Sequence, residues 1–167
     1  LEQKREILQK VYAKETFQGT KSEIIRQLID DNNEASKALI KSAIADKDVQ
    51  LHKAVINNAT VISEDMRSSY ETLLKSPSYD VVIAALDKLS MQFPDHINEY
   101  LGITKGVIGT SGRNVEIKWL EISARNNSMD QATLDKLVAY TNMYYEFRTR
   151  VNAEQALQRL DYFNEQM

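Results

Sequence analysis

The chain has 167 residues, of which 43% are hydrophobic and 27% charged, a balance typical of a globular domain with a sizeable core. Its 21 basic and 24 acidic residues give a formal net charge of −3, which argues against nucleic acid as a partner, because such domains carry a basic excess on one face. The absence of cysteine excludes disulfides, thiol nucleophiles and cysteine-ligated zinc. No apolar run is long enough to predict a membrane span, and the composition leaves the cellular compartment open.

Ten helices are predicted along the chain. Only five glycines and two prolines occur, and the long stretches without them favour helices over strands. Apolar side chains also recur at helical spacing, as at Ile24, Ile25 and Leu28. In chain order the predicted helices cover residues 2–14, 22–31, 34–46, 48–58, 63–75, 78–92, 95–103, 113–126, 130–142 and 146–162.

Helix starts and stops are marked by capping residues and prolines. A polar residue of the capping type stands just before or at the start of four apolar periodic runs; these residues are Ser22, Ser63, Ser78 and Asp130. Pro94 predicts that the preceding helix ends at about Phe93.

Four segments resemble one another at an interval of about one helical hairpin. Each has a valine near a predicted helix start and a small residue or leucine about five positions later. The valines are Val49, Val82, Val115 and Val151, so the steps are 33, 33 and 36 residues. A period between about 20 and 50 residues is typical of stacked units that cannot bury their apolar faces alone. The pattern predicts an all-α superhelix, a solenoid of about ten helices in antiparallel pairs, forming a single domain over residues 1–167.

The class of repeat follows from the signatures that are missing. Neither the Trp-x-x-Leu-Gly-x-x-Tyr pattern of tetratricopeptide repeats nor the Thr-Pro-Leu-His pattern of ankyrin repeats occurs. HEAT-like or armadillo-like helix pairs fit better, although these units are shorter than usual.

Residues suited to catalysis or metal binding are not grouped in the sequence. A zinc peptidase helix needs His-Glu-x-x-His, whereas His52 and His96 lie 44 residues apart and neither precedes a glutamate. Each histidine is therefore predicted to be a helix-surface or capping residue. The carboxylate pairs Asp30-Asp31 and Glu64-Asp65 suit helix ends or solvated faces. We predict no catalytic, cofactor-binding or metal-binding residue in this chain.

Two further features allow both a purely structural and a functional interpretation. The glycine-rich run between Gly102 and Arg113 matches no phosphate-binding motif and is predicted to be a helix end and turn, although a loop leading to a helix start can also bind an anion. Seven aromatic residues are predicted to pack mainly in the core, with a binding face as the alternative; they are Trp119, Tyr140, Tyr144, Tyr145, Phe147, Tyr162 and Phe163.

Four stretches between Tyr79 and Phe163 carry a family resemblance. They read LDKLSMQFP (86–94), EYLGITK (99–105), NVEIKWLEI (114–122) and FRTRVNAEQALQRLDYF (147–163). These four stretches resemble the C-terminal region of zinc aminopeptidases of the aminopeptidase N (gluzincin) family. Residues 1–62 are compatible with that region but less specific.

The resemblance implies a role without catalytic residues. In that family the C-terminal domain is a helical superhelix that folds against the catalytic domain and helps close the substrate chamber, while the zinc ion and the catalytic glutamate belong to an upstream domain. The implied partner is thus the upstream catalytic domain of the same polypeptide, with peptide substrate contacted at most indirectly. Arginines of the family's domain sometimes meet the far end of the substrate, but Arg113, Arg125, Arg148 and Arg150 match no such position.

Three functions are compared on this basis. The first is a non-catalytic C-terminal domain of a zinc aminopeptidase that shapes substrate access; the start of the chain at Leu1, within a charged amphipathic run, agrees with a piece of a longer protein. The alternative is a stand-alone HEAT-like scaffold that binds a protein or peptide. A free-standing enzyme is the least favoured, because no constellation of reactive residues is present.

Overall fold

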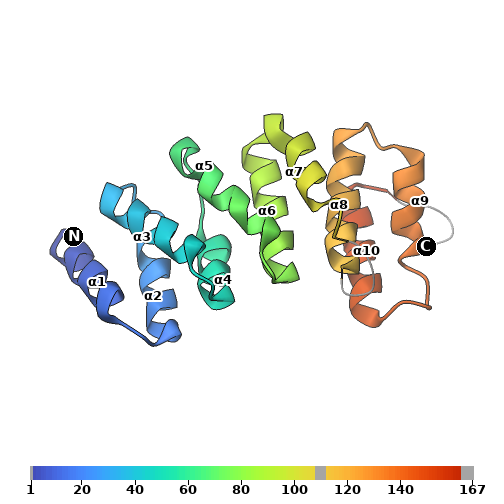
Figure 1. The fold of residues 1–167 in the computed structure, drawn as a ribbon. Coiled ribbons are helices and arrows are strands. Elements are labelled where there is room, and N and C mark those ends of the chain that lie inside the picture. Colours follow the sequence, from blue (N-terminus) through green and yellow to red (C-terminus); the bar gives the residue numbers. More distant parts are fainter. Residues whose placement is uncertain (1, 108–111, 163–167) are drawn as a thin grey trace. The chain divides into compact units, whose positions relative to one another are not determined.

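The computed structural model describes residues 2–107 and 112–162, and over these residues the chain is all-α (Figure 1). The described residues contain no strand. They form ten α-helices: α1 (Glu2–Lys14), α2 (Gln18–Leu28), α3 (Glu34–Ala45), α4 (Val49–Asn58), α5 (Glu64–Glu71), α6 (Tyr79–Gln92), α7 (Ile97–Thr104), α8 (Arg113–Asn126), α9 (Gln131–Ala139) and α10 (Phe147–Arg159). Two short 3-10 helices, η1 (Thr72–Lys75) and η2 (Pro94–His96), precede α6 and α7. None of the helices in these ranges is long and apolar enough to cross a membrane.

Each predicted helix corresponds to an observed one, and the signals at two ends, Asp130 and Pro94, are confirmed. The Asp130 carboxylate accepts the Thr133 N–H at 3.0 Å and so caps α9. Helix α6 ends at Gln92, two residues before Pro94, which starts η2. Ser63 is the residue before α5, although its side chain makes no capping bond to the helix.

The prediction for α2 is wrong at both ends. The helix begins at Gln18, so Ser22 lies inside it and does not cap it. Just before the helix, the Oε1 of Glu15 accepts the N–H groups of Thr16 and Phe17, each at 2.8 Å, in a tight turn. This turn closes before the residue that the apolar pattern marks as the start. At the other end, Ile29 follows the helix and the chain turns toward α3.

The chain forms two compact units, Leu1–Ala85 and Leu86–Met167, which we call the N-terminal unit and the C-terminal unit. In the N-terminal unit α2 packs on α4, α3 on α4 and α5, and α1 on α2 and α3. The side chains at its centre are fully buried and include Ile25, Ile40, Leu51, Val55 and Leu73. No residue of α1 is buried, so this helix is held mainly by the surfaces of its two neighbours.

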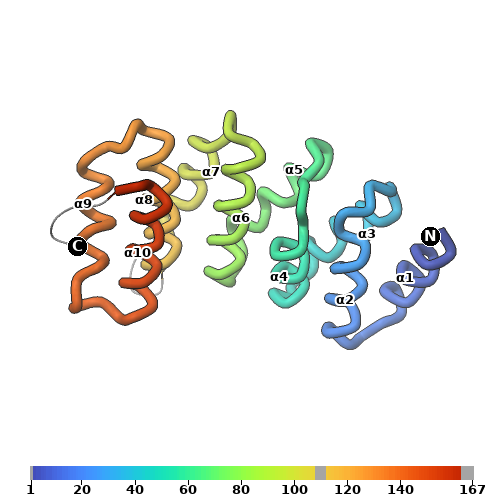
Figure 2. Tube along the Cα trace, turned by 180° about the vertical axis from the view of Figure 1, so that it is seen from behind, coloured from blue at the N-terminus to red at the C-terminus, as the bar shows by residue number. Residues whose placement is uncertain are grey.

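The C-terminal unit is built on three helices that contact one another pairwise, α8, α9 and α10, with α7 packed on α8 (Figure 2). Its core is a cluster of buried side chains from all three helices: Ile117, Leu120, Ala124, Leu134, Leu137, Ala153, Ala156 and Leu157. The alanines of α10 are fully buried, and their small size lets α10 approach its neighbours closely.

The four repeat valines each fall within the first five residues of a helix, on α4, α6, α8 and α10 in turn. Val82 and Val115 are buried, whereas Val49 and Val151 are half-buried. The period found in the sequence therefore marks every second helix of the chain.

Candidate functional site

The two histidines are both held by local partners. His52, in α4, is 7% exposed, so the prediction of a helix-surface position is wrong for it, whereas its bond to Asp46, the C-cap residue of α3, agrees with a capping role. Its Nε2 donates to the Asp46 carbonyl at 2.7 Å, and Nδ1 lies 3.4 Å from the Ser76 hydroxyl. His96 is the residue before α7, as predicted, and its Nδ1 lies 3.3 Å from a Glu99 carboxylate oxygen. Over residues 2–107 and 112–162, no group of three or more His, Asp or Glu side chains is placed to hold a metal ion.

The aromatic residues divide between the core and the surface. The Trp119 indole packs on the core of the C-terminal unit and donates to the Leu101 carbonyl at 2.8 Å, and Tyr140 and Tyr162 also pack there. The core prediction is wrong for Tyr144, which lies in the link between α9 and α10, and for Phe147, the first residue of α10; they are 95% and 73% exposed. Phe163 lies outside the described residues.

The arginines named in the sequence have different surroundings. Arg113 lies over the Tyr145 ring at 5.1 Å, and Arg150 over the Phe147 ring at 5.8 Å. Arg148 is exposed on α10, while Arg125 joins the ion cluster described below. The glycine-rich run is only partly described: α7 ends at Thr104 and Gly112 precedes α8, while residues 108–111, with the remainder of the anion-binding alternative, lie outside the described ranges.

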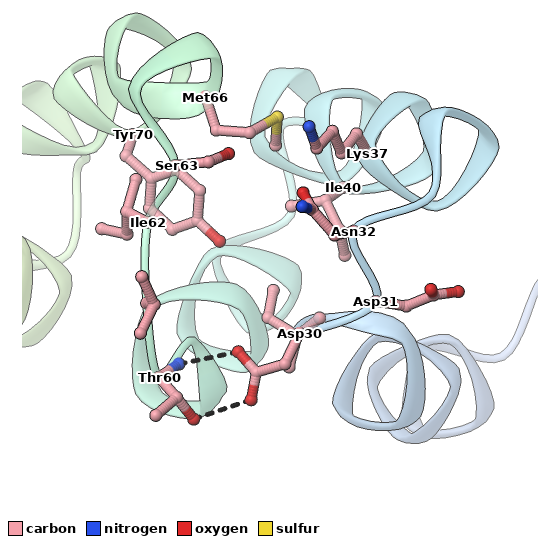
Figure 3. Close-up of a pocket in the computed structure, with 12 residues that line it drawn as sticks. Asp30, Asp31, Asn32, Lys37, Ile40, Thr60, Ile62, Ser63, Met66 and Tyr70 are labelled. Atoms are coloured by element: carbon pink, nitrogen blue, oxygen red, sulfur yellow. Dashed lines mark hydrogen bonds between the residues drawn. The ribbon is translucent and has the colours of Figure 1, made fainter.

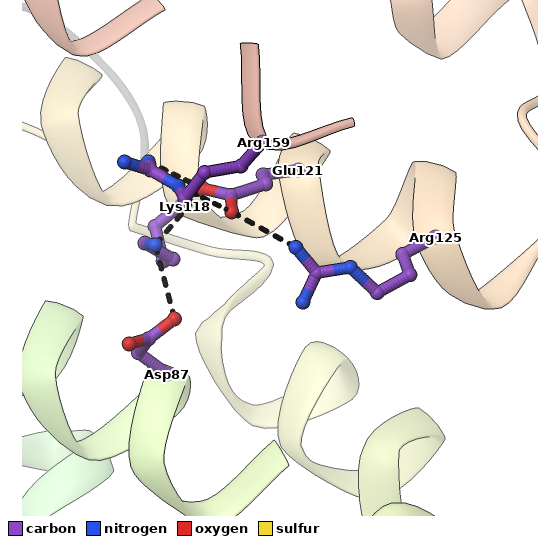
Figure 4. Close-up of polar contacts among 5 residues, drawn as sticks. All are labelled: Asp87, Lys118, Glu121, Arg125 and Arg159. Carbon is purple, nitrogen blue, oxygen red and sulfur yellow. Dashed lines mark hydrogen bonds and ion pairs between the residues drawn. The ribbon is translucent and has the colours of Figure 1, made fainter. Parts of the chain in front are cut away.

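Sequence reasoning missed a buried ion cluster in the C-terminal unit (Figure 4). Glu121, on α8, is 1% exposed. Arg159 of α10 donates to both of its carboxylate oxygens at 2.8 Å. Lys118 reaches the same carboxylate at 2.9 Å and Arg125 at 3.2 Å, and Lys118 also pairs with Asp87 of α6 at 3.0 Å. These five residues, the Glu121 cluster, join three helices.

The charge of Glu121 is maintained by its partners. Burial alone would raise the pKa of Glu121, but the hydrogen bonds from Arg159 and Lys118 outweigh it and hold that pKa below its ordinary value. The carboxylate therefore accepts bonds from three cations and has no free face for a substrate. We assign the cluster to holding the unit together. The spacing of Lys118 and Arg125 from Glu121 was visible in the sequence, but Arg159 is 38 residues away.

The N-terminal unit contains a pocket of about 380 Å³ that the sequence did not indicate (Figure 3). Its lining comes from the links that follow α2 and α4 and from the facing sides of α3 and α5. The two links are tied together by Asp30, whose carboxylate accepts the Thr60 N–H at 2.9 Å and the Thr60 hydroxyl at 2.7 Å. Ile40, Ile62 and Met66 supply an apolar wall and are at most 5% exposed.

Comparison of the chain with protein-family models, with curated proteins and with solved structures finds no match. Functional inference therefore depends on the residues and their geometry.

Proposed function

We propose that the chain is a non-catalytic C-terminal helical domain of a larger zinc metallo-aminopeptidase, in which it packs on the catalytic domain and shapes the access of peptide substrates. The observation that carries the proposal is the location of the four sequence stretches that resemble the aminopeptidase family. All four fall within the C-terminal unit, and they contact one another through specific side chains.

The Glu121 cluster joins three of these stretches. Asp87 comes from the first, Lys118 and Glu121 from the third, and Arg159 from the fourth. The remaining stretch is attached by Trp119, which donates to Leu101. The four stretches that resemble the aminopeptidase family thus pack together in one unit. This supports a common fold over the unit more strongly than four matches in separate units would.

The physical rationale is enclosure of an active site. A helical wall around a reaction chamber restricts which peptides enter and excludes bulk water from the chemistry. In this proposal the zinc ion belongs to an upstream domain, as the family resemblance implies. The proposed role of this chain is limited to positioning peptide substrates and selecting them by size.

We also propose that the helices continue as a HEAT-like or armadillo-like superhelix. This is supported by the repeat valines, which recur near the start of every second helix, and by the short links between successive helices. Small-angle X-ray scattering of the chain would test it: a solenoid gives an elongated pair-distance distribution, whereas a radius of gyration near that of a sphere of equal mass would refute it.

The decisive experiment on function is to read the coding sequence upstream of Leu1. A His-Glu-x-x-His segment is expected there, and its absence from the complete reading frame would remove the proposal. If the segment is present, the enzyme with and without residues 1–167 should be compared on a single-residue amide and on peptides of increasing length. Loss of discrimination between lengths is the expected result of removing the wall.

A stand-alone scaffold is the alternative, and the exposed apolar residues fit it as well as they fit the first proposal. Met143, Tyr144 and Phe147 are 88%, 95% and 73% exposed, and such an apolar group marks a surface for a partner. The catalytic domain would be that partner in the first proposal, and a separate protein in the second. A start codon immediately before Leu1, together with a stable complex recovered through this surface, would favour the scaffold.

A further inference from the structure

The pocket of the N-terminal unit contains a polar group without a partner. Tyr70 of α5 is 3% exposed, and its hydroxyl is directed into the pocket (Figure 3). No residue within 2–107 and 112–162 forms a hydrogen bond with this hydroxyl. The hydroxyl oxygen opens onto the pocket, so water or a bound molecule there can supply its hydrogen bond.

The charges around the pocket favour a cation. Asp30 lies at the rim, and Asp31 beside it is paired with Arg5 and accepts the Ser36 hydroxyl. Lys37, the one cation that lines the pocket, is bound by Asp65 at 2.9 Å and by Glu34 at 3.5 Å. The pocket lining thus holds two carboxylates, Asp30 and Asp31, and one cation, Lys37, and an anion would find Lys37 already neutralised.

The Tyr70 side chain is a neutral phenol in this pocket. Burial, together with the negative charge of Asp30, raises the pKa of Tyr70 above its ordinary value. A neutral phenol oxygen can accept a bond from an ammonium group while its own proton is donated elsewhere.

We propose that this pocket binds a primary alkylammonium group, with the alkyl stem against Ile40, Ile62 and Met66 and the ammonium between the Asp30 carboxylate and the Tyr70 hydroxyl. The apolar wall accounts for the stem, the excess of carboxylates for the charge, and the unpartnered phenol for the additional acceptor. A lysine side chain of a peptide and a free alkylamine share this chemistry. The inference goes beyond the proposed aminopeptidase role and does not depend on it.

The test is a methyl NMR titration of the 167-residue chain labelled with ¹³C at the methionine methyl groups. Met66 is the single methionine among the pocket residues, and the other four methionines act as internal references. The probes are n-butylammonium chloride, N-acetyl-lysine methylamide, and 1-butanol as the uncharged analogue. A saturable shift of the Met66 signal with both amines, and a weaker response to 1-butanol, is expected.

Two substitutions assign the binding to named groups. Tyr70→Phe removes one bond to a charged group and should raise the Kd for n-butylammonium about tenfold, and Asp30→Asn should raise it at least as much. Tyr79→Phe, which changes a tyrosine outside the pocket that is 42% exposed, is the matched control and should leave the Kd unchanged. The ¹H–¹⁵N spectrum of each variant verifies that it folds.

The possible results of the titration distinguish between kinds of amine ligand and include three that would overturn the proposal. Equal affinity for n-butylammonium and N-acetyl-lysine methylamide indicates a site for amines in general, whereas tighter binding of the lysine derivative indicates a peptide ligand. No shift at Met66, an equal response to 1-butanol, or an unchanged Kd in folded Tyr70→Phe would each overturn the proposal. The comparison of amine with alcohol uses the unmodified chain, so it decides the question even where a variant fails to fold.

Discussion

Replacing Glu121 with glutamine is expected to destabilise the C-terminal unit. Glutamine keeps the shape and one acceptor oxygen but places an NH₂ group where cations also donate. Removing one member of a buried ion pair costs about 3–5 kcal/mol when the other stays buried. Here Arg159 and Arg125 are 46% and 51% exposed, so water solvates them after the change. We therefore expect a loss of about 2–3 kcal/mol in the free energy of unfolding.

The single tryptophan makes the measurement specific to this unit. Trp119 lies two residues before Glu121 on α8, so its fluorescence during urea denaturation reports the unfolding of the C-terminal unit. The matched control is Glu154→Gln, an exposed carboxylate on α10, which should change the free energy of unfolding by less than about 0.5 kcal/mol. If Glu121→Gln behaves like this control, the cluster does not hold the unit together.

The pH dependence checks the same reasoning independently. Because the pKa of Glu121 is lowered in the folded chain, the stabilisation is fully present above the ordinary value of 4.5 and is lost as pH falls through the folded pKa. The difference between the unmodified chain and Glu121→Gln should therefore be largest near neutral pH and shrink below 4.5. A difference that stays constant down to about pH 3 would contradict the linkage.

Three further predictions concern packing, capping and metal content. Leu137→Ala removes a fully buried side chain from the core of the C-terminal unit and should lower the free energy of unfolding by about 3 kcal/mol in urea denaturation followed by Trp119 fluorescence. Asp130→Ala removes the cap of α9 and should cost about 1 kcal/mol in the same assay, whereas Asp130→Asn should cost much less. The purified chain should contain no stoichiometric zinc by elemental analysis and show no aminopeptidase activity, and either found positive would overturn the assignment of catalysis to an upstream domain.

What could be predicted from the sequence is what depends on near neighbours along the chain. Apolar spacing predicted the helices, and Asp130 and Pro94 marked helix ends, because each acts within about one turn. The start of α2 was missed because its first residues, 18–23, carry no large apolar side chain, so the apolar spacing begins only at Ile24.

The contacts that define the sites join residues far apart in the sequence. Arg159 meets Glu121 over 38 residues and Asp30 meets Thr60 over 30, and no local pattern predicts such partners. The exposure of Tyr144, in the link between α9 and α10, and of Phe147, the first residue of α10, is likewise not indicated by the spacing of aromatic residues.

The position of the Glu121 cluster also determines which experiments bear on function. Most of its residues lie in the stretches that resemble the family, yet their charged groups bind one another and not a substrate. Substitutions there should lower the stability of the unit and affect any parent enzyme only through folding. In the proposed role, steric selection would depend on exposed residues such as Tyr144 and Phe147, whose replacement by serine should leave the free energy of unfolding within about 0.5 kcal/mol. A change in peptide-length preference in the parent enzyme after Tyr144→Ser or Phe147→Ser, with unchanged zinc content and stability, would therefore separate a role in substrate access from a merely structural one.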